Sequence, residues 1–236
     1  MKLRSVVGVV ERKSYLKCAL LNVDGLTLSS LEDIRGVLEL KKPDVCVILE
    51  TKRREEEVGL EARIDGYSLT EIRRSDTAND RHGGGIAYYT RQVDGIVVHE
   101  HKPDIVDPGC HFVNKERVWL KTESTTNKTA ICAAYFGCQT PDNRHADWNS
   151  GMYKTVHEEE ASLRAQGYRI LMLTDVNAHI GSKKDEGIEG NHPDVNKNGR
   201  QLLDFLHSTR MKHVNGQKNL TKGLWTRQRG NSRTII

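Results

Sequence analysis

The chain lacks the long apolar segments and the targeting signals that would place a protein in or across a membrane. Its longest apolar runs are only a few residues, far short of the roughly 20 residues that a membrane-spanning helix needs. Residues 1–15 begin with basic character, but their apolar stretch is too short for a secretory signal. There is also no internal repeat and no low-complexity linker. We therefore expect no membrane partner, and one domain over residues 16–236 that follows an N-terminal extension over residues 1–15.

The cysteines show neither an even count nor the close pairing of a zinc site. Three of the five lie inside apolar, strand-like runs, where a thiol behaves as a small hydrophobic group. This usage predicts reduced thiols in an intracellular protein. The cysteines are Cys18, Cys46, Cys110, Cys132 and Cys138.

The net charge is only mildly basic. At +4, with a pI near 8.7, it permits a phosphate-rich partner but does not require one.

The start of the domain has the pattern of a strand–helix–strand unit. Residues 15–22 (YLKCALLN) predict a buried strand, and residues 28–40 carry apolar side chains at near-helical spacing with Ser29 or Ser30 as the N-cap. Residues 44–49 (DVCVIL) predict a second buried strand. Such a unit usually makes the two strands parallel neighbours, with functional groups collected at their carboxyl ends.

The rest of the chain is rich in short strands with helices between them. Both parallel and hairpin connections are implied, which favours a layered α/β or α+β sandwich over a doubly wound sheet. The chain ends within an apparent strand, so we expect a fragment of a domain. The predicted strands are 67–72, 85–90, 95–100, 118–121, 129–135, 168–174, 212–215, 224–227 and one beginning at 233; the predicted helices are 148–166, ended by Gly167, and 197–208.

Three buried strands are each followed by a polar group that can bind a hard cation or a phosphate. These are Asn22 in LNVDG, Glu50 in ILETK and Asp175 in LTDVN. Taken singly, they are ordinary: a turn former, an exposed charge after a strand, and an N-cap. Together they indicate one site, because parallel strands bring their carboxyl ends to the same edge.

At this point the motifs become specific. The series LNVDG, ILET, AAYFG, LTDVNAHIG and LWTRQRG, in this order, resembles the endonuclease/exonuclease/phosphatase superfamily. Within it, the chain is similar to the apurinic-type endonuclease domains of non-LTR (LINE-type) retrotransposons and to host proteins derived from them. The resemblance implies an α/β fold of the deoxyribonuclease I type, a four-layer sandwich of two mixed β-sheets flanked by helices, here without its last strands. It also implies an intracellular, nuclear protein.

The resemblance assigns a role to each matching residue. It implies an Mg²⁺ site, with Mn²⁺ as a possible substitute, and a glycine-started strand at 83–87. Asn22 and Glu50 match the family's metal ligands, and Tyr135 matches the tyrosine that contacts the scissile phosphate. Asp175 and Asn177 match the pair that orients the attacking water and holds the phosphate. The positions that match supporting or substrate-contacting residues are Thr226, His179 and Arg227. The chemistry agrees, since Mg²⁺ takes oxygen ligands from one or two carboxylates and keeps several waters.

The expected activity is Mg²⁺-dependent hydrolysis of a phosphodiester, with DNA as the partner that is nicked. We expect it to be impaired, because the chain stops at Ile236, before the aspartate and the Asp-His pair of the family pattern. The alternatives are a phosphatase of the same fold that acts on a lipid or small phosphoester, and a non-catalytic nucleic-acid-binding remnant. Basic side chains predicted to lie beside the site and contact phosphates are Arg73, Arg74, Arg81, Arg91, Arg227, Arg229 and Arg233.

Overall fold

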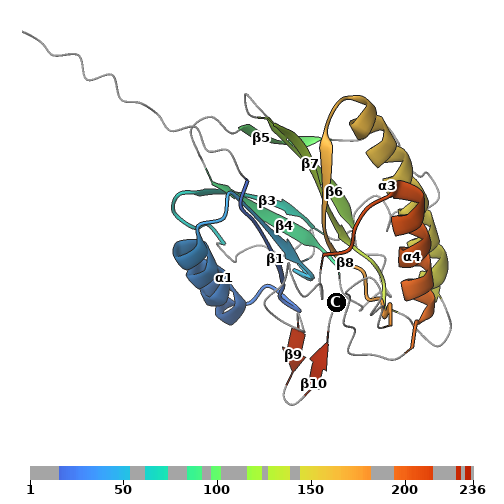
Figure 1. Cartoon of the computed structure of the whole chain (residues 1–236). Helices are drawn as coiled ribbons and strands as arrows, with labels where there is room; N and C mark the ends of the chain where they lie inside the picture. The colour runs from blue at the N-terminus through green and yellow to red at the C-terminus, as the bar shows by residue number, and fades with distance from the viewer. Residues whose placement is uncertain are drawn as a thin grey trace, which may run out of the picture.

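The computed structural model has two four-stranded β-sheets that face each other, with helices on their outer sides (Figure 1). In the part that it describes, no helix is long and apolar enough to cross a membrane. It describes residues 16–53, 62–73, 84–91, 97–101, 116–123, 127–138, 144–181, 194–214, 227–229 and 232–234, without the side chains of 144–147 and of residues from 227 onward.

The order of elements alternates short strands with three helices among these residues. They are β1 (Cys18–Asn22), α1 (Leu28–Lys41), β2 (Val45–Leu49), β3 (Tyr67–Ile72), β4 (Ile86–Arg91), β5 (Val97–His101), β6 (Arg117–Glu123), β7 (Lys128–Tyr135), α3 (Arg144–Ala165), β8 (Arg169–Asp175), α4 (Lys197–Thr209), β9 (Arg227–Arg229) and β10 (Ser232–Thr234).

Each sheet contains one parallel pair of strands. The first sheet has the order β1-β2-β4-β3, with β1 parallel to β2 and the other neighbours antiparallel. The second has the order β5-β6-β7-β8, with β7 parallel to β8. Strands β1 and β8 also lie against each other, and β9 and β10 form a separate hairpin. Both parallel pairs therefore bring two carboxyl ends together, and the contact between β1 and β8 joins the two pairs.

Strand β2 is apolar at every position, with no alternation of apolar and polar residues, because both of its faces are buried. Val45, Val47 and Leu49 face the second sheet, where they pack with side chains of β6 and β7. Cys46 and Ile48 point the opposite way, into the layer formed with Leu31, Ile34 and Leu38 of α1. A strand buried on both faces needs apolar residues at every position.

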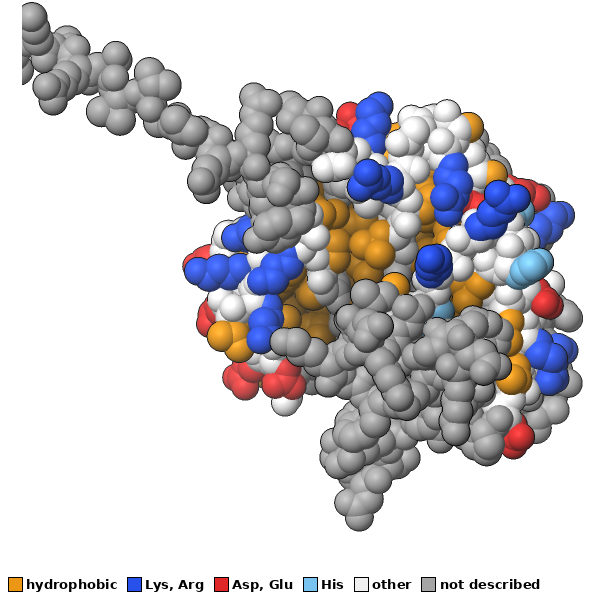
Figure 2. Space-filling model, viewed as in Figure 1, with side chains coloured by type: hydrophobic (Ala, Val, Ile, Leu, Met, Phe, Trp, Pro, Cys, Tyr) orange, Lys and Arg blue, Asp and Glu red, His pale blue; other side chains and the backbone are white. Residues whose placement is uncertain are grey.

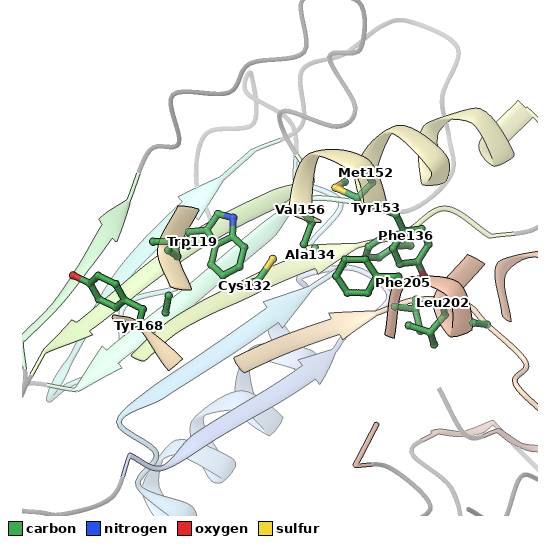
Figure 3. Packing of buried hydrophobic residues seen from close by; sticks show 14 residues of the cluster. Trp119, Cys132, Ala134, Phe136, Met152, Tyr153, Val156, Tyr168, Leu202 and Phe205 are labelled. Atoms are coloured by element: carbon green, nitrogen blue, oxygen red, sulfur yellow. The ribbon is translucent and has the colours of Figure 1, made fainter. Parts of the chain in front are cut away.

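The outer layer on the second sheet is built by α3 and α4 (Figure 3). Cys132 and Ala134 of β7 present small side chains to this layer. Above them Tyr153 packs between Phe136 and Phe205, with ring centroids 4.5 Å and 5.2 Å away. The sandwich therefore has four layers, in the order helix, sheet, sheet, helices, as expected from the resemblance.

Strands β3 and β5 are one pair of sheet edges, and β1 and β8 are the edges that lie against each other. Among the described residues, no further strand pairs with either one. Leu20, Leu171 and Leu173 are only partly buried where they pack against the core between the sheets. Hydrophobic side chains are visible over the middle of the face in Figure 2, with Lys and Arg around them.

Most predicted elements are confirmed, with three corrections. The N-cap of α1 is Thr27, not Ser29 or Ser30, and it exchanges hydrogen bonds with Ser30 in a capping box. Helix α3 begins at Arg144, one turn before the prediction. No strand is present over residues 211–214, because the chain there closes the end of α4: Met211 N–H donates to Leu206 O at 3.1 Å. Residue 215 and most of 224–227 lie outside the described residues.

A buried ion pair fixes α3 on the second sheet. The Glu159 carboxylate accepts hydrogen bonds from the Arg117 guanidinium, the shortest at 2.6 Å, and from Trp119 Nε1 at 2.7 Å.

We predict that Glu159→Ala lowers the free energy of unfolding by about 3–5 kcal/mol, because it leaves a buried guanidinium without its counterion. Urea denaturation measures this. The neighbouring exposed Glu158→Ala should stay within about 0.5 kcal/mol of the wild type. A Glu159→Ala protein as stable as Glu158→Ala would contradict the assignment.

Candidate active site

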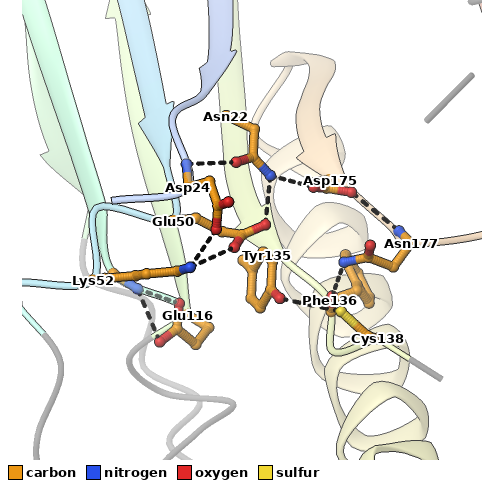
Figure 4. A network of polar contacts seen from close by, with 11 residues as sticks. Asn22, Asp24, Glu50, Lys52, Glu116, Tyr135, Phe136, Cys138, Asp175 and Asn177 are labelled. Atoms are coloured by element: carbon orange, nitrogen blue, oxygen red, sulfur yellow. Dashed lines mark hydrogen bonds and ion pairs between the residues drawn. The ribbon is translucent and has the colours of Figure 1, made fainter. Parts of the chain in front are cut away.

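Four of the predicted site residues lie at the carboxyl ends of the two parallel pairs (Figure 4). Asn22 ends β1 and Glu50 follows β2 in the first sheet, while Tyr135 ends β7 and Asp175 ends β8 in the second. Sequence reasoning grouped three strand ends as if they shared one sheet. The structure brings the residues together across two sheets, through the contact between β1 and β8.

Asn22 connects the two sheets at this point. Its Nδ2 donates to Glu50 Oε1 at 2.6 Å and to Asp175 Oδ2 at 2.6 Å. Its Oδ1 accepts from the backbone N–H of Asp24 at 3.1 Å, which fixes the orientation of the amide. One neutral carboxamide therefore holds a carboxylate from each sheet.

Glu50 stands on a backbone that an ordinary residue rarely adopts. Its φ is +55°, and Asp24, Lys52 and Asn177 beside it also have positive φ. The only other non-glycine residues of the described chain in this region of φ are the C-cap residues of α1 and α4. Such conformations cost about 1–3 kcal/mol each and persist only when the surroundings enforce them.

Hydrogen bonds on both sides enforce the conformation at Glu50. Its carbonyl accepts from Gly25 N–H at 2.8 Å, and the next two residues donate to the start of β4, Thr51 to Gly85 O at 3.1 Å and Lys52 to Gly84 O at 2.9 Å. The chain after β2 is thus fixed between the β1 loop and β4, and the Glu50 side chain is turned toward Asn22.

The glycine run before β4 has the structural role that was predicted. A Cβ at Gly84, whose φ is +93°, would overlap the Glu116 carboxylate. That buried carboxylate accepts the Gly85 N–H at 2.9 and 3.1 Å, a second tie between the sheets at the site end. Gly83 lies outside the described residues.

Tyr135 supplies a neutral hydroxyl. Burial raises the pKa of its phenol far above the usual value, and the nearby Glu50, Cys138 and Asp175 raise it further. The phenol is therefore protonated at neutral pH and can donate a hydrogen bond. The hydroxyl lies 3.6 Å from Cys138 Sγ.

Asn177 closes the loop after β8. Its backbone N–H donates to Asp175 Oδ1 at 3.2 Å, so each oxygen of the Asp175 carboxylate has a defined partner. Its side-chain Nδ2 donates to Phe136 O at 2.8 Å, which ties the loop after β8 to the loop after β7.

The charges at the site suit a hard divalent cation. Two carboxylates share one amide nitrogen, and the nearest ammonium, Lys52 Nζ, is 4.0 Å from Glu50 Oε2 and also pairs with Asp24. No group of three or more His, Cys, Asp and Glu side chains in the described ranges converges on a metal position. The carboxylate oxygens of Glu50 and Asp175 are hard donors that fit Mg²⁺, a metal that keeps several of its waters, while the Asn22 amide turns its nitrogen to them and its oxygen to Asp24 N–H.

The other predicted residues have mixed outcomes. His179 packs at the start of α4, where its backbone N–H donates to Asn196 Oδ1 at 3.0 Å. The prediction for Arg91 is wrong, because it ends β4 at the opposite end of the sheet and pairs there with Asp44 at 2.8 Å. Arg73 follows β3 at the site end and pairs with Glu71 at 3.2 Å. Thr226, Arg74 and Arg81 lie outside the described residues, as do the side chains of Arg227, Arg229 and Arg233.

Sequence reasoning missed several residues that hold the site. Lys52, Asp24 and Glu116 carry charges within it, but each looked like an ordinary polar residue of a loop. Asn149 and Asn198 were also missed because both lie inside predicted helices. The only sequence signal was that asparagine is unfavourable in a helix interior and needs a reason to be there.

Comparison with solved structures identifies the fold. The chain is similar to the AP endonuclease LMAP from Leishmania major, with a TM-score of 0.61 and 15% identity over 82% of this chain and 66% of that one. The 3'-5' exonuclease NExo from Neisseria meningitidis gives 0.56 and 16%, covering 81% and 71%. The endonuclease domain of TRAS1, a telomere-specific non-LTR retrotransposon, gives 0.50 and 14%, covering 82% and 72%.

The chain spans about two thirds of the length of the Leishmania enzyme. No protein-family model matches the sequence, and the search among curated proteins found no match. The likeness therefore rests on the arrangement of strands and helices. With two mixed four-stranded sheets between helical layers, this chain has the fold of the endonuclease/exonuclease/phosphatase superfamily.

Proposed function

We propose that this protein is a divalent-metal-dependent phosphodiesterase whose substrate is DNA. The observation that carries the proposal is the convergence of Glu50 and Asp175 on the Asn22 amide. Two carboxylates held by one neutral amide form a negative site, which a divalent cation stabilises and to which it can bring a phosphate.

Each residue then has a chemical role. Glu50 would hold the cation, and Asn22 would present its amide oxygen to it after the amide turns its nitrogen away from the two carboxylates. The cation would neutralise charge on the phosphoryl oxygens. Asp175 aligns the attacking water and accepts its proton, because its carboxylate is fixed by Asn22 and by the Asn177 backbone. Tyr135 O–H and the second N–H of the Asn177 amide donate to the phosphoryl oxygens as negative charge develops there.

DNA is the substrate that the comparisons favour. One similar structure is that of the 3' phosphatase NExo from Neisseria bound to a product DNA hairpin, and others are those of an AP endonuclease and a retrotransposon endonuclease domain. A nuclear, retrotransposon-derived endonuclease is the form of the proposal that the resemblance of the motifs favours.

The metal site gives the first test. We predict that Mn²⁺ or Mg²⁺ binds the wild-type chain with an affinity that falls at least about tenfold in Glu50→Gln, which removes the charge and keeps the shape. Calorimetric titration measures the affinity. Glu32→Gln is the matched control, since Glu32 is an exposed residue of α1. Equal affinity of Glu50→Gln and wild type would exclude Glu50 as a ligand.

Activity gives the second test. We predict that the protein nicks supercoiled plasmid in Mg²⁺ or Mn²⁺ and not in chelator. We also predict that Asp175→Asn lowers the rate at least about 100-fold, the effect of losing a general base. Gel assays at excess protein measure it. Asp33→Asn, on the exposed side of α1, should keep the wild-type rate.

The same wild-type and Asp175→Asn proteins distinguish a nuclease from a phosphatase, the alternative activity. They are assayed on a 3'-phosphorylated oligonucleotide and on a small aryl phosphate. Release of phosphate from these without nicking of plasmid would replace the nuclease with a phosphatase. Plasmid nicking that is equal in the wild type and Asp175→Asn would indicate a contaminating nuclease and contradict the proposal.

A further inference from the structure

We propose that Asn149 of α3 and Asn198 of α4 are positioning residues that hold the loops carrying Tyr135 and Asn177. The inference rests on the proposed function, since the positioned groups are those assigned to the phosphate and the water. Both side chains are almost completely buried, with 1% and 2% of their surface exposed. A buried carboxamide is costly unless its hydrogen bonds are satisfied, so two of them beside the site call for an explanation.

Asn149 holds the loop after β7. Its Oδ1 accepts the Gly137 N–H at 2.8 Å and its Nδ2 donates to Gly137 O at 3.0 Å. The side chain thus binds both polar groups of one residue, as a neighbouring strand would. Because Gly137 is two residues after Tyr135, this pairing fixes the direction in which the chain leaves β7.

Asn198 joins this loop to the one after β8. Its Nδ2 donates to Gly137 O at 3.0 Å and to Asn177 O at 3.1 Å. Its Oδ1 accepts from Asn149 Nδ2 at 3.2 Å, so the two amides orient each other. Asn177 has a φ of +45°, and the bond to its carbonyl helps to enforce that conformation.

The start of α4 is built to place Asn198 there. Asn196 caps the helix by accepting from Gly199 N–H at 2.7 Å, and the same oxygen accepts from His179 N–H at 3.0 Å. A Cβ at Gly199 would overlap the carbonyl of His179. The sequence Asn196-Lys-Asn-Gly therefore docks the first turn of α4 directly onto the chain that leaves β8.

These hydrogen bonds tie the loop after β7 to the loop after β8, both in the second sheet. Phe136 N–H donates to Asp175 O at 2.9 Å, and Asn177 returns a bond to Phe136 O at 2.8 Å. With Asn149 and Asn198 added, the two loops of the second sheet move as one unit. Glu50 and Asn22 belong to the first sheet, and Asn22 meets this network only at the far side of Asp175, through its bond to that carboxylate. We therefore expect Asn149 and Asn198 to act on catalytic geometry much more than on metal affinity.

The test is Asn198→Asp, which keeps the size but faces the carbonyls of Gly137 and Asn177 with an oxygen. We expect the single-turnover cleavage rate to fall about 10- to 100-fold, within the range of a lost positioning contact. The half-saturating DNA concentration should stay within about threefold and the Mn²⁺ affinity within about twofold, since the cation and its ligands are untouched. Asn198→Ser, which retains one donor, should have an intermediate rate and decides the matter if Asn198→Asp does not fold.

Leu163→Ala is the matched control for lost stability. Leu163 is a buried residue near the end of α3, and its carbonyl accepts from Tyr168 N–H at the start of β8, away from the site. This variant should be at least as destabilised as Asn198→Ser and yet cleave within about threefold of wild type at a temperature where all the variants are folded. Equal rate losses in Leu163→Ala and Asn198→Asp would overturn the proposal.

Hydrogen exchange supplies a readout that does not depend on activity. In Asn198→Asp the amides of Gly137 and Asn177 should exchange at least about tenfold faster, while Cys132 in the middle of β7 keeps its wild-type protection. Unchanged exchange at both amides would overturn the positioning role. A wild-type protein that does not cleave any phosphodiester would instead overturn the proposed function, and the exchange rates would still decide whether the network holds the loops.

Discussion

The interaction on which the site depends is the pair of hydrogen bonds from one carboxamide, Asn22, to Glu50 and Asp175. It joins the carboxyl ends of β1 and β8, strands that belong to two different sheets. The bond pair is possible only because the sheets face each other with their parallel pairs aligned at the same end. Burial between the sheets supplies that alignment, since the apolar residues of β2 and β7 interdigitate there.

The backbone around the site has unfavourable conformations that hydrogen bonds hold in place. Four non-glycine residues with positive φ surround it, and each is fixed by backbone or side-chain bonds. Such geometry is expected where side chains must hold one orientation for a function. The two halves are fixed differently: Glu50 by the backbone after β1 and before β4, and the loops that carry Gly137 and Asn177 by buried amides from α3 and α4. The two halves are therefore held by separate sets of hydrogen bonds and meet at the bond from Asn22 to Asp175.

The strands and helices were largely readable from the sequence, because each sheet layer is buried on two faces and so leaves uninterrupted apolar runs such as VCVIL. The residues at the strand ends were readable because polar groups follow those runs. What the sequence did not reveal was the pairing of strands distant along the chain. It gave no sign that β1 meets β8, or that Arg91 lies at the far end of its sheet, since an antiparallel strand reverses direction. The amides of Asn149 and Asn198 were hidden for the same reason: their partners are in loops 12 and 61 residues away.

The central claim is that Glu50 and Asp175, from separate sheets, serve one metal and phosphate site. Crystals soaked in Mn²⁺ and measured for anomalous scattering test it most directly. The account predicts one strong peak within about 2–2.5 Å of a Glu50 carboxylate oxygen, the range for hard-cation ligands, on the side that faces Asp175. A peak bound elsewhere, with Glu50 and Asp175 still joined through Asn22 as they are now, would contradict it.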